Sequence, residues 1–448
     1  MIIKFKNLGP IESGEINFND LKGINLIIGK NNTGKTYLSN LLYSYFKVRQ
    51  RQDLKMKEVF DINFKKELSN LDYETIKHYF EKKYESEIKN ILPQIFHTSK
   101  DIFKDFKIEV GLSDEILEFK KLDDYTIICF REMKKTIKLK KMQNKIEYIM
   151  EDYDENKGKR YTTYKAKIQE EDAKQFIFGY FLHIKFFQKI YKFYSFPAER
   201  SGAVLFYKQL LEERSDVLRE LELGNSENIG KISRYSEPVN DYVKFLNSIS
   251  DRSKGLTELD IYKKLDTELK EILGGEVIID LEGNIMFRMN EKKIIDIGMV
   301  SSTVKTLTGF YLYLKYFAME RDIIFIDEIE LNLHPENQRK IMKLINYLSK
   351  QGIKFIISTH SPIITEEIDN MLLFEKVKDK INSEEMKEYG INSEYGLKTS
   401  DINVFHLHNK TVEKIKEKNG EFEIETFNTV LEETDNLYQT LLFYAEEK

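Results

Sequence analysis

Short apolar runs separated by turns open the chain, and this pattern is typical of strands. Runs at residues 2–5, 15–18 and 24–28 predict three strands, the last of which leads directly into Gly29. After a polar loop, apolar residues recur at the spacing of one helix face, namely Leu38, Leu41, Leu42 and Tyr45. The opening of the chain therefore predicts strands, a loop and a helix in direct succession.

A second group of core elements is expected towards the other end of the chain. Apolar strands at 323–326 and 355–357 flank an amphipathic helix with Pro335 near its first turn and Gly352 just past its end. A strand, a helix and a strand in this order predict a crossover in a parallel sheet. One further strand is expected at 404–408, before a charged helical tail.

The middle of the chain has a different character, with charged helical stretches and short strand-like runs. We therefore predict an α/β fold whose core is interrupted by two lobes. The expected segments are a first part of the core at 1–47, an inserted lobe at 48–190, a core strand and turn at 191–202, a helical lobe with a hairpin at 203–290, and a second part of the core with a C-terminal tail at 291–448.

Composition and charge are those of an ordinary globular protein. Of the 448 residues 41% are hydrophobic, and 70 Lys and Arg stand against 75 Asp and Glu, so the overall charge gives no support to nucleic-acid binding. The sequence shows neither a secretory signal nor a run of roughly 20 apolar residues, so we expect a cytoplasmic protein without a membrane contact. The single cysteine, Cys129, lies in an apolar run and is expected to be a buried, inert thiol.

The loop after the third strand carries the first candidate chemistry. Its residues match G-x-x-x-x-G-K-[ST] between a predicted strand and a predicted helix, which is the context this motif requires. The glycines let backbone N–H groups face a phosphate, Lys35 adds a positive charge, and the Thr36 hydroxyl is a ligand for Mg²⁺. The nucleotide-binding residues expected here are Gly29, Asn31, Asn32, Thr33, Gly34, Lys35, Thr36 and Tyr37.

Two acids at the end of a buried strand are the second candidate. Asp327 and Glu328 directly follow the apolar run 323–326, which places them at the sheet edge where ligands bind in open α/β folds. Asp327 is expected to hold the magnesium through a water, and Glu328 to orient and polarise the attacking water. Taken alone, the acid pair is equally well explained as the polar end of a strand.

A histidine follows the next strand of the crossover. His360 comes one crossover helix after the acid pair, where a neutral imidazole can donate a hydrogen bond to a γ-phosphate or to the attacking water. A lone histidine is more often a packing or surface residue, so this role depends on its place beside the acids. The candidate catalytic residues are therefore Lys35, Glu328 and His360.

These residues resemble the ABC-type ATPases that include RecF and SMC heads, and most closely the OLD-like ATPases. The resemblance is carried by residues 5–11, the phosphate loop, residues 327–336 with their Leu-His-Pro-Glu element, and residues 358–362. It implies a P-loop NTPase fold with an ABC-type head, in which a mixed sheet is flanked by helices and carries inserted α/β and helical lobes. It also implies ATP and Mg²⁺ as cofactors and ATP hydrolysis as the activity.

In such ATPases a Ser-Ser-Gly at a helix start touches the γ-phosphate bound by the opposite subunit. The matching run here is Ser301-Ser302-Thr303, so the resemblance implies a homodimer or higher homo-oligomer in which Ser301 and Ser302 complete the partner's site. Thr303 replaces the glycine, which puts trans-activation of hydrolysis in question. A simple helix cap explains the same residues.

Arg200 lies in a turn also shared with OLD-like ATPases, where it is expected either to couple the insert to the nucleotide or to stabilise the turn.

OLD-like nucleases carry a Toprim domain after the ATPase, whereas only a short charged tail follows Leu407. We therefore expect no built-in nuclease but a separate, nuclease-like effector protein. In this layout the chain is similar to the stand-alone ATPases of Septu and PARIS antiphage systems.

One alternative is a RecF- or SMC-like ATPase for DNA repair or chromosome maintenance, with DNA held by lysines at 47–66 or 134–145. Interleaved acids make a solvated face the simpler explanation of those lysines. A second alternative, suggested by Thr303, is a nucleotide-binding scaffold with little hydrolysis.

Overall fold

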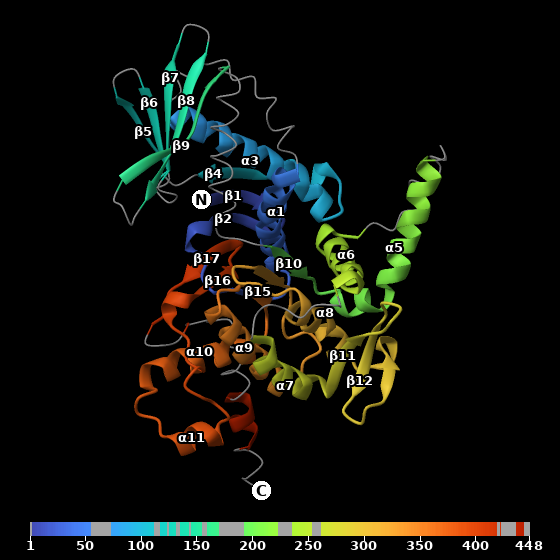
Figure 1. Cartoon of the computed structure of the whole chain (residues 1–448). Coiled ribbons are helices and arrows are strands. Elements are labelled where there is room, and N and C mark those ends of the chain that lie inside the picture. The colour runs from blue at the N-terminus through green and yellow to red at the C-terminus, as the bar shows by residue number, and fades with distance from the viewer. Residues whose placement is uncertain are drawn as a thin grey trace.

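The computed structural model describes residues 2–54, 73–111, 117–122, 125–130, 135–142, 145–154, 159–169, 192–222, 235–252, 261–418, 422 and 436–442. Within these ranges the central element is a nine-stranded sheet with helices on both faces (Figure 1). Its strands are, in spatial order, β10 (Phe193–Phe196), β14 (Ile323–Ile326), β15 (Lys354–Thr359), β3 (Ile24–Gly29), β16 (Ile402–His408), β17 (Thr411–Ile415), β2 (Ile11–Asn17), β1 (Ile2–Leu8) and β4 (Lys107–Gly111). The mixed α/β fold expected from the sequence is confirmed.

Helices account for most of the remaining described residues. They include α1 (Lys35–Leu54), α3 (Tyr73–Ile95), α5 (Arg200–Glu222), α6 (Glu237–Arg252), α7 (Ile261–Leu273), α8 (Ser302–Tyr316), α9 (Pro335–Lys350), α10 (Pro362–Val377) and α11 (Ser383–Glu388). Pro335 begins α9 and Gly352 follows its end with a φ of 90°, as the sequence predicts for a helix between these two residues.

The five strands from β10 to β16 in the spatial order run parallel to one another. Strand β17 pairs antiparallel with β16 and parallel with β2, and β2, β1 and β4 complete the sheet as an antiparallel edge. Because parallel strands point the same way, the loops that follow β3, β14 and β15 leave the sheet at the same edge. The phosphate loop, the acid pair and His360 are thereby brought to one edge of the sheet.

Strands β3 and β14 are buried on both faces, which explains their uninterrupted apolar sequences. Leu26 and Ile324 pack into the core on the side of α8 and α9, whereas Ile27 and Phe325 pack into the core on the side of α1 and α3. The alternation follows from the two-residue period of a strand. Each strand is therefore held in place by both layers of helices.

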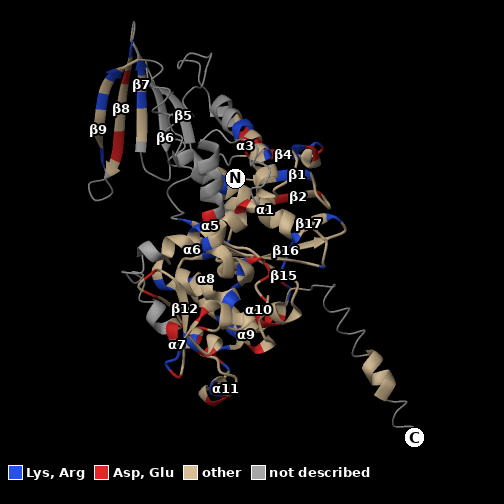
Figure 2. Cartoon of the chain, turned by 90° about the vertical axis from the view of Figure 1, so that its right-hand side faces the viewer, with Lys and Arg blue, Asp and Glu red and all other residues tan. Residues whose placement is uncertain are grey.

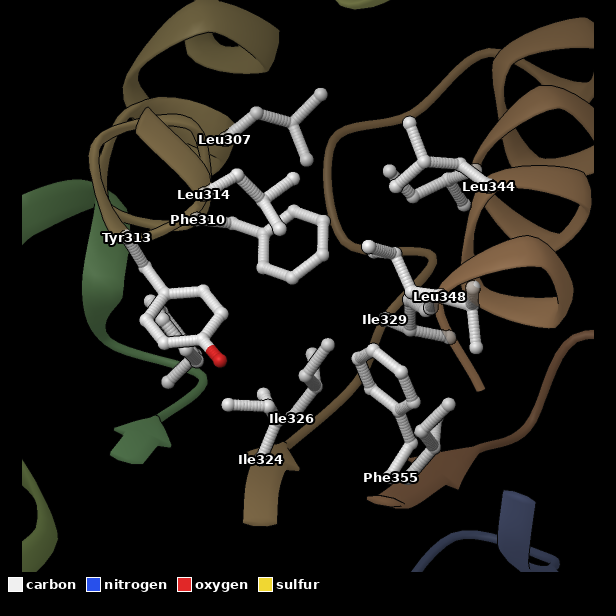
Figure 3. Packing of buried hydrophobic residues seen from close by; sticks show 14 of the residues in the cluster. Leu307, Phe310, Tyr313, Leu314, Ile324, Ile326, Ile329, Leu344, Leu348 and Phe355 are labelled. Atoms are coloured by element: carbon white, nitrogen blue, oxygen red, sulfur yellow. The ribbon is translucent and has the colours of Figure 1, made fainter. Parts of the chain in front are cut away.

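The packing beneath the acid pair is shown in Figure 3. Phe310 of α8 and Leu344 and Leu348 of α9 converge on Ile324 and Ile326 of β14, and all five are buried. A fully buried side chain of this size contributes roughly 1.5–3 kcal/mol. This core fixes the end of β14, and with it the two acids, relative to the starts of α8 and α9.

The region expected as an inserted lobe is only partly separate from the core. Helix α1 continues past residue 47 to Leu54, and β4 pairs with β1 as an edge strand of the main sheet. Ile108 and Val110 of β4 alternate inward and join the core of Ile3 and Phe5. A five-stranded antiparallel sheet then forms the separate part, with strands β5 (Leu117–Leu122), β6 (Tyr125–Phe130), β7 (Lys135–Lys141), β8 (Ile146–Asp154) and β9 (Lys159–Ile168).

The helical segment that follows β10 agrees with the sequence, and its expected hairpin is β11 (Gly275–Ile279) and β12 (Ile285–Met289). Two strands outside the region of the expected inserted lobe were not expected. Strand β13 (Ile294–Asp296) has three residues, which is too short for an alternating pattern, and β17 has charged residues that suggest a solvated tail. Both are held by pairing to longer strands, β12 and β16.

Some sequence-based expectations fall outside the described part of the chain. These concern the candidate DNA-binding lysines between residues 55 and 66, and the side chain of Cys129, of which only the strand β6 is described. Among the residues that are described, no helix has both the length and the apolar character needed to cross a bilayer.

Candidate functional site

The phosphate loop connects β3 to α1 and rests on the turn between β1 and β2. Gly34 has a φ of +103°, and a Cβ atom there would lie 2.8 Å from a side-chain carbon of Ile11 and 2.9 Å from one of Pro10. Both the dihedral angle and the contact require glycine at this position. The loop therefore needs its second glycine to keep its backbone N–H groups at the sheet edge.

Lys35 is the only charged residue of the expected binding set, and it is 8% exposed. Its Nζ donates to the carbonyl oxygens of Gly29 at 2.7 Å and Lys30 at 2.9 Å. Burial lowers the pKa of Lys35, and the carboxylates of Glu330, Glu328 and Asp327 oppose that shift. The lysine thus lies over the loop, within the electrostatic reach of all three acids.

The other loop residues differ in exposure. Asn31, Asn32 and Thr36 are exposed, whereas the Thr33 hydroxyl donates to the Lys30 carbonyl at 2.8 Å. The ring of Tyr37 stacks on Phe96 with ring centres 4.7 Å apart, and it closely approaches Gly9 of the β1–β2 turn. Contact with nucleotide therefore remains a prediction for the asparagines and for Tyr37, whose ring here has a packing role.

The acid pair follows β14 and is held by the neighbouring strand. The Ser358 hydroxyl donates to the Asp327 carboxylate, and the Glu328 N–H donates to the Ser358 oxygen at 2.9 Å. Burial raises the pKa of Asp327, and burial together with the charge of Asp327 raises that of Glu328. Glu328 has a φ of +47°, in the left-handed region that non-glycine residues rarely adopt. Such strain is common at functional sites.

His360 directly follows β15 and is held by an acid for which the sequence predicted no role. Glu330 is buried and accepts hydrogen bonds from the Thr359 hydroxyl and the His360 backbone N–H, both at 2.8 Å. Its Oε1 also lies 2.8 Å from the imidazole Nδ1 of His360. The signal for Glu330 was its place two residues after Glu328, but its partners are thirty residues away in sequence and emerge only in the fold.

Ser301 and Ser302 lie apart from this group. Both are exposed at the start of α8, where Ser301 caps the helix by accepting from the Val304 N–H at 3.3 Å. Within the described residues, no hydrogen bond joins either serine to the phosphate loop of the same chain. Thr303 donates to the carbonyl of Asn332 at 2.7 Å, which ties the start of α8 to the loop after the acids.

A cavity of about 190 Å³ lies beside Thr36 and Asp327, the two expected metal ligands. Further oxygen-bearing side chains on its wall belong to Ser39, Asn40, Tyr43, Ser195, Glu199 and Ser236. Hydroxyl, amide and carboxylate oxygens are the ligands that a hard cation such as Mg²⁺ prefers, and Mg²⁺ usually keeps several waters. The residues present therefore fit a hydrated Mg²⁺ at Thr36 and Asp327.

Comparison with known families agrees with this geometry. Residues 1–365, more than half of the chain, match the protein family described as AAA ATPase domain. The chain belongs to this family. The matched span of the AAA ATPase domain includes the phosphate loop, the acid pair and His360, which the fold brings to one sheet edge.

Solved structures similar to this AAA ATPase domain chain include SMC heads. An SMC head bound to the C-terminal winged-helix domain of ScpA is 12% identical with a TM-score of 0.34, covering 95% of this chain and 98% of that chain. The SMC head domain of Thermotoga maritima is 11% identical with a TM-score of 0.27, covering 93% and 98%. An SMC head with an extended coiled coil, bound to a ScpA domain from Pyrococcus furiosus, is 13% identical with a TM-score of 0.31, covering 97% and 98%.

Proposed function

We propose that this chain binds ATP with Mg²⁺ and hydrolyses it to ADP and phosphate. The observation that carries the proposal is the convergence of Lys35, Asp327, Glu328 and His360 at the ends of three neighbouring strands of one sheet, β3, β14 and β15, with Lys35 in the electrostatic field of the acids. Strand ends capped by acids do not by themselves create this arrangement. Membership in an ATPase family supports the same reaction.

Each residue has a distinct part in this reaction. The backbone N–H groups of the phosphate loop and the Lys35 ammonium bind the β- and γ-phosphates. Thr36 and Asp327 hold the Mg²⁺, which when bound neutralises charge on the phosphates. The carboxylate of Glu328, whose pKa is raised by burial and by Asp327, orients the attacking water and accepts its proton. Nδ1 of His360 faces the Glu330 carboxylate, which only accepts hydrogen bonds, so the proton of the neutral imidazole lies on Nδ1. Nε2 is then the acceptor that takes a hydrogen bond from the attacking water.

Two subunits are proposed to close head to tail around two nucleotides. Ser301 and Ser302 are exposed at a helix start and lie apart from the loop of their own chain, which is the placement that contact with a partner's γ-phosphate needs. Glu328→Gln should then bind ATP, release no phosphate and elute as a dimer on size exclusion with Mg²⁺ and ATP. Equal phosphate release by wild type and Glu328→Gln would refute Glu328 as the base.

The dimer is proposed to act as a switch for a separate effector protein in antiphage defence. This step rests on the resemblance of residues 327–336 and 358–362 to OLD-like ATPases, and not on a contact in the fold. Affinity purification of the chain from its native host should recover an effector encoded in the neighbourhood. Recovery of the homodimer alone would contradict this part of the proposal.

The charge distribution does not favour the DNA-binding alternative. Lysines on β7 and β9 flank acids on β8 (Figure 2), and Lys138 pairs with Glu151 at 2.7 Å and Lys165 with Glu147 at 3.0 Å. The neighbouring carboxylates offset the positive charge of these two lysines and repel phosphates, which weakens a DNA track on this sheet. A filter-binding titration with double-stranded DNA should therefore show weak binding without a steep salt slope, whereas tight binding with a steep slope would favour the DNA-repair reading.

A further inference from the structure

A buried arginine holds the backbone of the acid pair. Arg200 is the first residue of α5, directly after the turn that follows β10, and it is 2% exposed. Its Nη1 donates to the carbonyl oxygen of Asp327 at 2.5 Å, and its Nη2 donates to that of Glu328 at 2.7 Å. Nη1 also donates to the carbonyl of Pro197 at 3.1 Å. The planar guanidinium thus connects the start of α5 to two consecutive peptide groups of the acid loop.

These two peptide groups determine where the Glu328 side chain points. The carbonyl of Asp327 belongs to the peptide before Glu328, and the carbonyl of Glu328 belongs to the peptide after it. The two hydrogen bonds hold the backbone of Glu328 at its φ of +47°. Without such support, a non-glycine residue would relax to a negative φ. On the other side, the Glu328 N–H is held by Ser358. The direction of the Glu328 carboxylate is therefore set by Arg200 and Ser358 together.

A structural brace alone would not require a charged group in this place. Burial lowers the pKa of Arg200, while the Tyr242 hydroxyl and the carboxylates of Asp327, Glu330 and Glu328 oppose that shift. Carbonyl oxygens can be bound by neutral donors, so the guanidinium adds an electrostatic effect on the acids to its hydrogen bonds.

Helix α5, which begins with Arg200, is also connected to the phosphate-loop helix α1, through α6. Asp241 of α6, which packs against α5, accepts from the Tyr43 hydroxyl at 2.5 Å and from Lys47 Nζ at 2.6 Å. Tyr43 and Lys47 belong to α1, the helix that begins with Lys35. These contacts fix the start of α5 relative to the phosphate loop. Because Arg200 begins α5 and binds the acid loop, it also fixes Glu328 relative to the phosphate loop.

We propose that Arg200 is a positioning residue for ATP hydrolysis, which holds the Glu328 carboxylate at the attacking water by binding the carbonyl oxygens of Asp327 and Glu328. This inference rests on the proposed function, because it needs Glu328 to act as the base. It assigns to Arg200 an effect on turnover and not on nucleotide binding, since Arg200 contacts the acid loop and not the phosphate loop.

The test compares Arg200→Lys and Arg200→Gln with wild type in the full-length protein. Lysine keeps the charge but lacks the planar fork, and glutamine keeps a donor but lacks the charge. Both variants should bind Mg-ATP within about threefold of wild type by calorimetry and lose phosphate release on the order of 100-fold, as a displaced catalytic group does.

Lys208→Met is the matched control, since Lys208 lies on the same helix but donates to the side chain of Asn284, away from the acids. It should leave turnover unchanged. Arg200 variants that melt like wild type and hydrolyse ATP within twofold of it would overturn the inference. The inference would also be overturned if Arg200→Lys lost affinity for ATP and this loss accounted for its whole loss of turnover. Absence of phosphate release from wild type itself would instead refute the proposed function, which separates the two failures.

Discussion

The imidazole Nδ1 of His360 lies 2.8 Å from Oε1 of Glu330, so the residue after β15 is held by the loop after β14. The same carboxylate accepts from the Thr359 hydroxyl and from the His360 backbone N–H. Glu330 therefore fixes both the position and the ring orientation of His360. It connects the acid loop to the histidine. The sequence predicted that these two parts of the site lie close together, but not which residue joins them.

Replacing Glu330 should reduce turnover more than nucleotide binding. In Glu330→Ala, His360 loses its orienting partner, and by analogy with groups that orient active-site histidines, phosphate release should fall by about 10–100-fold. The buried donors left unpaired should also lower the free energy of unfolding by about 1–3 kcal/mol. Urea unfolding and phosphate release measure the two effects separately.

Glu336→Gln is the control for the Glu330 variant. Glu336 lies in the same segment but is exposed and pairs with Lys340, so its loss should change neither quantity appreciably. Wild-type turnover in Glu330→Ala would show that His360 needs no support from Glu330.

Gly34→Ala tests the geometry of the phosphate loop without removing a charge. The new Cβ would meet Ile11 and Pro10 on the β1–β2 turn, at a φ that alanine rarely adopts. The loop should shift, and affinity for Mg-ATP measured by calorimetry should fall at least tenfold, while Lys35 remains in place. Unchanged affinity would mean that the loop does not form the binding surface.

A close helix contact behind the site gives a stability prediction. A Cβ on Gly309 of α8 would lie 2.2 Å from the hydroxyl oxygen of Tyr242, which is buried. Gly309→Ala should lower the free energy of unfolding by about 1–3 kcal/mol through overpacking. Gly202→Ala, on α5 with open space around the new Cβ, should be neutral or stabilising by up to about 1 kcal/mol. Equal melting temperatures for the two variants would contradict the contact.

Asp322 makes stability depend on pH in a definite direction. Burial, only partly offset by the Tyr313 hydroxyl and the Met319 N–H, raises the pKa of Asp322 from 3.8 to about 6. Between those values the folded protein binds more protons than the unfolded chain, so stability falls as pH rises from 4 to 6, by about 3 kcal/mol in total. Asp322→Asn should remove this loss and gain stability at pH 8 but not at pH 3.5. Urea unfolding of both proteins at both pH values measures this change in the free energy of unfolding. An equal change at pH 3.5 and pH 8 would refute the raised pKa of Asp322.

The strands and helices that carry the site were predictable because their signals are local. An apolar run before Gly29, a motif between a strand and a helix, and a proline and a glycine at the ends of α9 each need only a few neighbouring residues. The edge strand β17 was not predictable, because its charged sequence forms a strand only by pairing with β16. The place of β4 in the main sheet was not predictable for a similar reason, since β4 joins the sheet by pairing with β1.

Within the site, the sequence identified the groups expected to touch nucleotide but not the residues that hold them. The contacts of Glu330 and Ser358, and those of Arg200 with the acid pair, join residues that lie 29 to 128 positions apart in the chain. No local spacing encodes such contacts. Arg200 was noticed through its turn, but its bonds to Asp327 and Glu328 required the parallel pairing of β10 with β14.

Calorimetric titration of the full-length chain with ATP, with and without Mg²⁺, tests the central claim most directly. The account predicts micromolar or tighter binding that depends on Mg²⁺ and disappears in Lys35→Ala, while Lys30→Ala, an exposed neighbour in the loop, retains it. Wild-type protein that shows no Mg²⁺-dependent affinity for ATP, or Lys35→Ala that binds as tightly as wild type, would contradict the account.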